Sequence, residues 1–162
     1  MQKYERNLDS GSLNQENLQE NSVWEEVYKE SEVMAIARKL LGFFSEEKIW
    51  TISGDLGAGK TTLIRAICQL LGVKSPVQSP TFSIVLPYTG EKCFIYHFDC
   101  YRLESKEDFF SIGGHEYLYS GEYCFLEWAE NIKEVFDTPV LNIHIEFMNE
   151  TERKLTAAYI NL

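Results

Sequence analysis

Two hydrophobic periods alternate along this chain, one typical of buried strands and the other of amphipathic helices. Apolar residues recur every three or four positions in residues 33–44 and 63–71, which predicts two helices. Ser31 is then expected to be the N-cap of the first helix, and Gly72 to follow the second. Short runs of bulky β-forming residues predict strands over residues 22–28, 48–53, 82–88, 92–99, 123–128, 140–147 and 154–162.

Strands and helices that alternate in this way predict an α/β fold. Residues 89–91, Thr-Gly-Glu, join two of the strands through a short turn, so we expect a hairpin and therefore a mixed, partly antiparallel central sheet. Ser105 is expected to cap a further short helix. Four residues in 140–147 alternate with polar neighbours and are expected to face the core, namely Leu141, Ile143, Ile145 and Phe147.

The first part of the chain has a different composition. Residues 1–21 are polar, and leucine is their only aliphatic residue type after Met1, which predicts a flexible tail. Residues 22–162 are expected to form a single domain, because a chain of 162 residues that is 44% hydrophobic suits one core.

The charge balance limits the choice of partners. The formal net charge is -10, whereas a protein that holds nucleic acid on its own surface needs clustered lysine and arginine to neutralise phosphates. If RNA is involved, we expect a partner protein to bind it.

The four cysteines form no CxxC pair and lie within strand-like or helix-like runs. They are expected to be buried free thiols rather than a zinc or disulfide framework. With no apolar run of membrane-spanning length and no secretory signal, the sequence predicts a cytoplasmic protein and no membrane partner.

A phosphate-binding loop follows the strand-like run at 48–53. Residues 54–61 match GxxxxGKT at every fixed position, with a strand before and a helix after. Glycines let backbone N–H groups approach phosphate oxygens closely, and the start of a helix favours negative charge. Lys60 is expected to reach the β and γ phosphates, and the Thr61 hydroxyl to coordinate Mg2+. The expected nucleotide contacts in this loop are Gly54, Asp55, Leu56, Gly57, Ala58, Gly59, Lys60, Thr61 and Thr62.

Glu127 ends the buried-looking run Tyr-Cys-Phe-Leu, the form expected of a Walker-B strand. Its carboxylate should lie across from the phosphate loop and bind Mg2+ directly or through water. Two roles fit the adjacent Trp128, stacking beside the nucleotide or filling the core.

Two further polar residues follow predicted loop and strand ends. Thr81 lies in a Pro-containing loop, where its hydroxyl either senses the nucleotide, as switch loops do, or stabilises a turn. Asp99 ends a strand, where open α/β sheets assemble their sites. It either caps a turn or holds Mg2+ or a water indirectly, through a group that binds it.

Together these motifs resemble the bacterial TsaE (YjeE) family, the ATPase component of the machinery that makes N6-threonylcarbamoyladenosine (t6A) in tRNA. The resemblance runs from about residue 28 to residue 131. Its motifs are 54–62, Ser-Pro-Thr-Phe at 79–82, Tyr-His-Phe-Asp at 96–99 with Tyr-Arg-Leu at 101–103, and Glu-Trp at 127–128.

The resemblance implies a three-layer P-loop NTPase that hydrolyses ATP with Mg2+ while docked on the TsaD and TsaB proteins, and that meets tRNA only through that complex. By position it implies a phosphate contact for Lys60, Mg2+ ligation by Thr61 and Glu127, and roles in ATP turnover for Thr81 and Asp99. It also places Trp128 close to the nucleotide. Residues 113–116, Gly-Gly-His-Glu, depart from the usual Gly-Ile-Arg-Asp, and Cys100 replaces a usual leucine.

Two other functions remain open from the sequence. One is a small phosphotransferase, although such kinases usually carry an arginine-bearing lid that this chain lacks. The other is a non-catalytic assembly factor, in which the bound nucleotide orders a docking surface.

Overall fold

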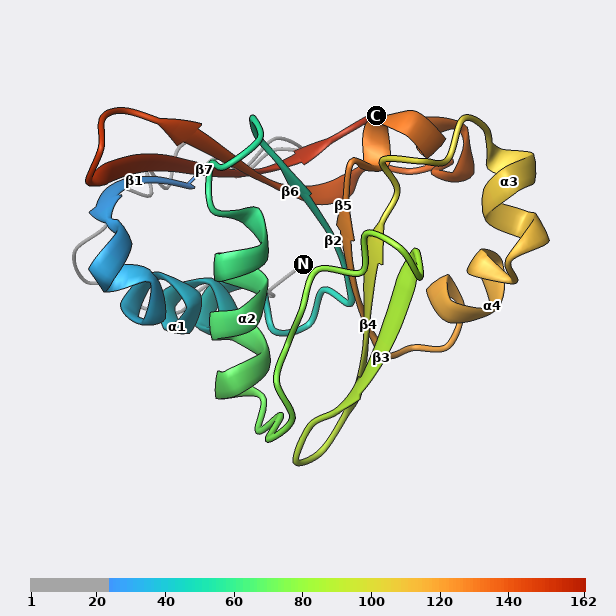
Figure 1. Cartoon of the computed structure of the whole chain (residues 1–162), viewed down its shortest axis with the longest axis horizontal. Coiled ribbons are helices and arrows are strands. Elements are labelled where there is room, and N and C mark those ends of the chain that lie inside the picture. The colour runs from blue at the N-terminus through green and yellow to red at the C-terminus, as the bar shows by residue number, and fades with distance from the viewer. Residues whose placement is uncertain (1–23) are drawn as a thin grey trace, which may run out of the picture.

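The computed structural model describes residues 24–162, and all seven strands belong to one sheet (Figure 1). The strands are β1 (Trp24–Lys29), β2 (Ile49–Ser53), β3 (Val85–Thr89), β4 (Phe94–Asp99), β5 (Tyr123–Glu127), β6 (Val140–Phe147) and β7 (Glu152–Ile160). The helices are α1 (Val33–Phe44), α2 (Lys60–Leu70), α3 (Lys106–Ser111) and α4 (Gly114–Leu118), with the 3-10 helices η2 (Glu30–Glu32) and η3 (Ala129–Val135).

The sheet is mixed, in the order β1-β7-β6-β2-β5-β4-β3. Strand β2 lies at the centre and pairs in parallel with β5 and β6, while β4 pairs in parallel with β5. The pairs β1–β7, β6–β7 and β3–β4 are antiparallel, and the last of these is the predicted hairpin. Pro87 is tolerated in β3 because that strand lies at the edge of the sheet.

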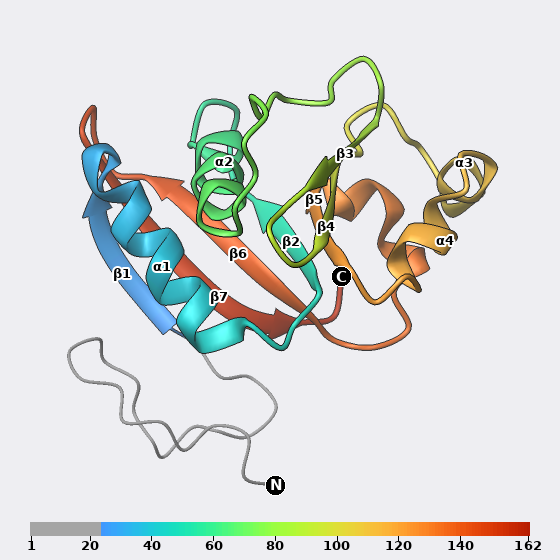
Figure 2. The ribbon, with the colours of Figure 1, turned by 90° about the horizontal axis from the view of Figure 1, so that it is seen from below.

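Helices cover both faces of the sheet, which gives the three expected layers. Every residue of β5 is buried, as in a strand covered on both sides. Phe125 belongs to the core beneath α1 and α2, whereas its neighbour Leu126 belongs to a second core with Phe109 of α3. In Figures 1 and 2, α1 and α2 lie along β1, β7 and β6, and α3 and α4 lie toward the β3–β4 end.

Most elements agree with the sequence predictions. The strand predicted at 82–88 begins only at residue 85, because residues 82–84 form a turn in which Ile84 has a φ of +67°. Helix α4 was not predicted, and two further differences concern Ser31 and Phe147. Ser31 does not cap α1, because the chain first makes the 3-10 turn η2 and Glu32 then occupies the N-cap position without a side-chain capping bond. Phe147 does not face the core. It is 53% exposed at the end of β6, where the Arg153 guanidinium lies 4.5 Å from its ring centroid.

Several smaller expectations are confirmed. The Ser105 hydroxyl accepts a hydrogen bond from the Asp108 N–H at the start of α3. The four cysteines are free, and three of them, Cys68, Cys100 and Cys124, are buried, while Cys93 is partly exposed. The predicted tail and the first two residues of the predicted strand at 22–28 lie outside the described residues. Within residues 24–162, no helix combines the length and the apolar character needed to cross a membrane.

Candidate functional site

The carboxyl ends of three neighbouring parallel strands bring the predicted residues to one edge of the sheet. The register pairs Ile52 of β2 with Glu127 of β5, and Glu127 with Asp99 of β4. The phosphate loop leaves β2 just beyond Ile52 and leads into α2 at Lys60. Such an edge is where open α/β sheets bind their ligands.

Residues of β6 and β7 contact the phosphate loop and support its shape. Gly54 has a φ of +140°, and a Cβ there would overlap the Ile145 carbonyl oxygen of β6. Arg153 of β7, itself buried, donates from Nε to the Ala58 carbonyl at 3.2 Å. Gly59 takes a left-handed conformation at the N-cap of α2. The loop shape therefore requires glycine at two positions and a distant hairpin for support.

Lys60 lies across the loop rather than out in solvent. Its Nζ donates to the Gly54 carbonyl at 2.7 Å and to the Asp55 carbonyl at 3.0 Å. The same ammonium lies 4.5 Å from the centroid of the Trp128 ring. The Lys60 ammonium therefore lies next to the phosphate loop, where it could bind phosphate oxygens.

One carboxylate oxygen of Glu127, at the end of β5, contacts side chains from both α2 and β4. Glu127 Oε1 accepts from the Thr61 hydroxyl at 2.8 Å and lies 2.8 Å from His97 Nε2. Glu127 is 4% exposed as a residue, and His97 is fully buried. The structure therefore brings Thr61 and Glu127 together as the sequence predicts, and a hydroxyl beside a carboxylate suits Mg2+, which is usually bound by few protein ligands together with phosphate oxygens and water.

Trp128 packs against the second core cluster and also faces Lys60. Its backbone has a φ of +59°, a left-handed conformation that costs energy in a bulky residue. The half-buried ring packs edge-on against Tyr101 at 5.2 Å between centroids and also faces the Lys60 ammonium. The strained backbone directs the ring toward the phosphate loop.

Asp99 and Thr81 lie in two segments next to the site, the turn after β4 and the loop before β3. Asp99 Oδ1 accepts from the Tyr101 N–H at 3.0 Å, so its carboxylate caps the turn after β4. The Asp99 N–H donates to the Ile84 carbonyl at 2.8 Å. The Thr81 hydroxyl is exposed and lies 2.9 Å from that of Ser79. No hydrogen bond within residues 24–162 joins the side chain of either residue to Lys60, Thr61 or Glu127.

Two residues that contact the site, His97 and Arg153, were not predicted from the sequence. A signal for His97 was present, since it lies two positions before Asp99 on a strand and therefore on the same face of the sheet. No pattern in the sequence around Arg153 indicates its contact with Ala58, because the two residues are 95 positions apart.

A nucleophilic cysteine at the site is disfavoured. Cys100 directly follows Asp99, and burial raises the pKa of its thiol far above the usual range, with the Asp99 carboxylate as the next largest cause. A thiol held in its neutral form is a poor nucleophile.

The fold and the site together define an α/β protein with a P-loop fold. A crystal structure of Bacillus subtilis YdiB superposes with a TM-score of 0.69 and 30% identity over 86% of each chain. The family model for the threonylcarbamoyl adenosine biosynthesis protein TsaE matches residues 27–155.

Relatives agree with this match. The chain is 36% identical over 133 residues to the tRNA threonylcarbamoyladenosine biosynthesis protein TsaE of Bacillus subtilis, which covers 82% of each protein. It is 34% identical over 127 residues to the Haemophilus influenzae protein of the same name, covering 78% of this chain and 80% of the relative. The chain belongs to the TsaE family of tRNA threonylcarbamoyladenosine biosynthesis.

Proposed function

We propose that this chain is the ATPase subunit of the tRNA t6A modification complex, binding ATP with Mg2+ and hydrolysing it in the cytoplasm while docked on TsaD and TsaB. The observation that carries the proposal is the bond from the Thr61 hydroxyl to Glu127 Oε1 beside the phosphate loop. It joins the hydroxyl of the GKT motif to the strand-end acid in the arrangement that phosphoryl-transfer sites use for a metal ion.

Each residue has a physical task in this reaction. Backbone N–H groups of 54–59 and the N-terminus of α2 bind phosphate oxygens, and Lys60 adds a positive charge. Thr61 and Glu127 would hold Mg2+, which would supply positive charge to neutralise the charge that develops on the phosphoryl oxygens. Thr81 and Asp99 would orient the attacking water.

Exposed apolar side chains around the site support a protein partner. Leu56 of the phosphate loop is 91% exposed, Phe82 beside Thr81 is 92% exposed, and Tyr101 is 63% exposed. Large exposed apolar side chains near a site favour docking of another protein. A docked partner would also exclude water from the phosphates and strengthen their interaction with Lys60. The net charge of -10 fits contact with tRNA through the partners rather than directly.

The test measures ATP hydrolysis by the purified chain, alone and with TsaD and TsaB. We expect low turnover alone and strong stimulation by the partners, and Lys60→Ala should abolish both. Transfer of phosphate to an added nucleoside or metabolite, with no stimulation by the partners, would instead establish a kinase.

Glu127→Gln separates the ATPase from a non-catalytic assembly factor. The amide oxygen can still accept the Thr61 hydrogen bond, but the negative charge at the metal site is lost. If hydrolysis drives the cycle, this variant should stop t6A formation by the reconstituted complex. An assembly factor would keep t6A formation as long as the nucleotide still binds.

A further inference from the structure

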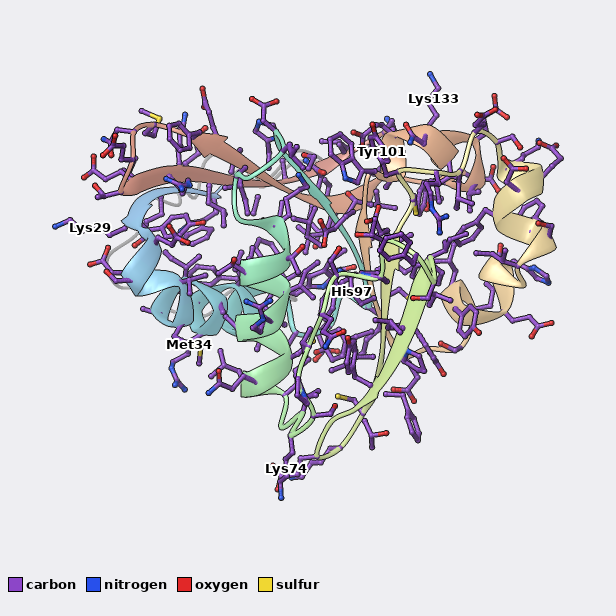
Figure 3. All side chains as sticks on the ribbon, viewed as in Figure 1. Lys29, Met34, Lys74, His97, Tyr101 and Lys133 are labelled. Atoms are coloured by element: carbon purple, nitrogen blue, oxygen red, sulfur yellow. The ribbon has the colours of Figure 1, made fainter. Side chains whose placement is uncertain are left out.

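His97 is a fully buried histidine that contacts Glu127 directly. Its Nε2 lies 2.8 Å from Glu127 Oε1, and the contact crosses from β4 to β5. Figure 3 labels His97 in the middle of the molecule. The register pairs His97 with Phe125 and Asp99 with Glu127, so the imidazole reaches Glu127 diagonally along the same face of the sheet.

The surroundings of the ring assign its tautomer. Nδ1 is buried and has no hydrogen-bond partner among the described residues. An N–H placed at Nδ1 would be an unsatisfied buried donor, which is costly, whereas Nε2–H donates directly to the carboxylate. His97 therefore carries its proton on Nε2, and Nδ1 is the bare acceptor.

Glu127 Oε1 consequently accepts two side-chain hydrogen bonds, one from His97 and one from the Thr61 hydroxyl. Among residues 24–162, no side chain donates to the other oxygen, Oε2. Two donors on one oxygen fix the rotation of the carboxylate group, because turning it would break both bonds. The donors come from β4 and α2, so the carboxylate is held from two sides.

We propose that His97 is a positioning residue that fixes Glu127 Oε1 and thereby presents Oε2 to the metal of a metal–nucleotide ligand. This inference rests on the proposed function of the site. It assigns His97 no contact with the nucleotide itself. Hydrogen bonds that orient a ligating group commonly contribute about 10- to 100-fold in metal affinity.

The alternative is a histidine that only fills the core, in which case an apolar residue of similar size would serve equally well. The two roles differ in what they require at the position of Nε2. Positioning needs an N–H donor there, and core filling does not.

The experiment measures the affinity of the full chain for ADP, once with Mg2+ and once with EDTA. The ratio of the two affinities is the Mg2+-dependent gain in ADP affinity. Three variants are compared with the wild type. His97→Gln places an amide N–H close to the position of Nε2, His97→Asn has an amide that falls one carbon short, and His97→Leu has no donor.

We expect the Mg2+-dependent gain to fall by about 10-fold or more in His97→Asn and His97→Leu and to stay within about 3-fold of wild type in His97→Gln. Affinity for ADP in EDTA should be unchanged in all three, which also shows that each variant is folded. The Gln and Asn pair differs only in reach, so the comparison holds even if the Leu variant does not fold.

Two outcomes would overturn the inference. One is an unchanged Mg2+-dependent gain in His97→Asn, and the other is an equal loss in His97→Gln and His97→Asn, because then the donor at Nε2 is not what matters. If wild type itself gained nothing from Mg2+, the proposed metal–nucleotide function would fail instead.

Discussion

The Thr61 hydroxyl and the Glu127 carboxylate are joined by a 2.8 Å hydrogen bond although 66 residues separate them in the sequence. The bond links the first turn of α2 to the end of β5, so the helix that starts at the phosphate loop and the strand-end acid cannot move independently without losing it. A substitution of either residue should therefore alter the position of the other. The site is best tested by substituting residues around this pair.

Trp128 should report nucleotide binding by its fluorescence. The chain has three tryptophans, and Trp24 and Trp50 are fully buried in the core beneath α1 and α2, whereas the Trp128 ring faces Lys60. Adding ADP should change the emission of the wild type but not of Trp128→Phe. Trp24→Phe is the control and should keep the signal. A response that persists in Trp128→Phe would show that the ring does not face the ligand.

Two glycines should respond in opposite ways to alanine. Gly54→Ala places a Cβ against the Ile145 carbonyl and forces a φ of +140° on a residue with a side chain, so the free energy of unfolding should fall by about 2–4 kcal/mol. Gly42 lies in α1 with open space around its Cβ position, and Gly42→Ala should raise the same free energy by about 0.5–1 kcal/mol. Urea denaturation followed by circular dichroism measures both. Equal effects of the two substitutions would contradict the described loop geometry.

Alkaline pH should destabilise the fold through its buried thiols. Burial raises the pKa of Cys68 from 9.0 to about 12, and likewise that of Cys124. The unfolded thiols ionise at lower pH than the folded ones, so their contribution to stability is complete below about pH 9 and is lost as the pH rises toward 12. The free energy of unfolding should therefore decline over this window, by at most about 1.4 kcal/mol per pH unit for each thiol. Urea titrations at a series of pH values measure the slope, and Cys68→Ala should make it shallower. A slope that Cys68→Ala leaves unchanged would argue against this origin.

The parts of the site that were predictable from sequence are those in which neighbouring residues act together. GxxxxGKT between a strand and a helix predicts the phosphate loop, because the loop, the lysine and the helix start are contiguous. Glu127 was predictable because a buried run of β-forming residues ends in an acid. The seven strands and the hairpin followed from hydrophobic period and turn residues in the same local way.

The remaining features depend on contacts that the sequence does not display. The bond from His97 to Glu127 requires the register between β4 and β5, and the support of Ala58 by Arg153 requires that β7 reach the phosphate loop. Ser31 failed as a cap because a 3-10 turn intervenes before α1. Phe147 follows the alternating pattern of β6 but lies beyond the part of that strand that the core covers.

The contact between Arg153 and Ala58 has a consequence for synthesis of the protein on the ribosome. The phosphate loop appears early in the chain, yet its carbonyl at Ala58 is held by a residue 95 positions later, and Gly54 packs against β6, which is also made late. The loop cannot take its final shape until β6 and β7 have left the exit tunnel and paired with the sheet. A nascent chain that has passed residue 61 but not residue 153 therefore carries the whole nucleotide-binding motif without the framework that shapes it.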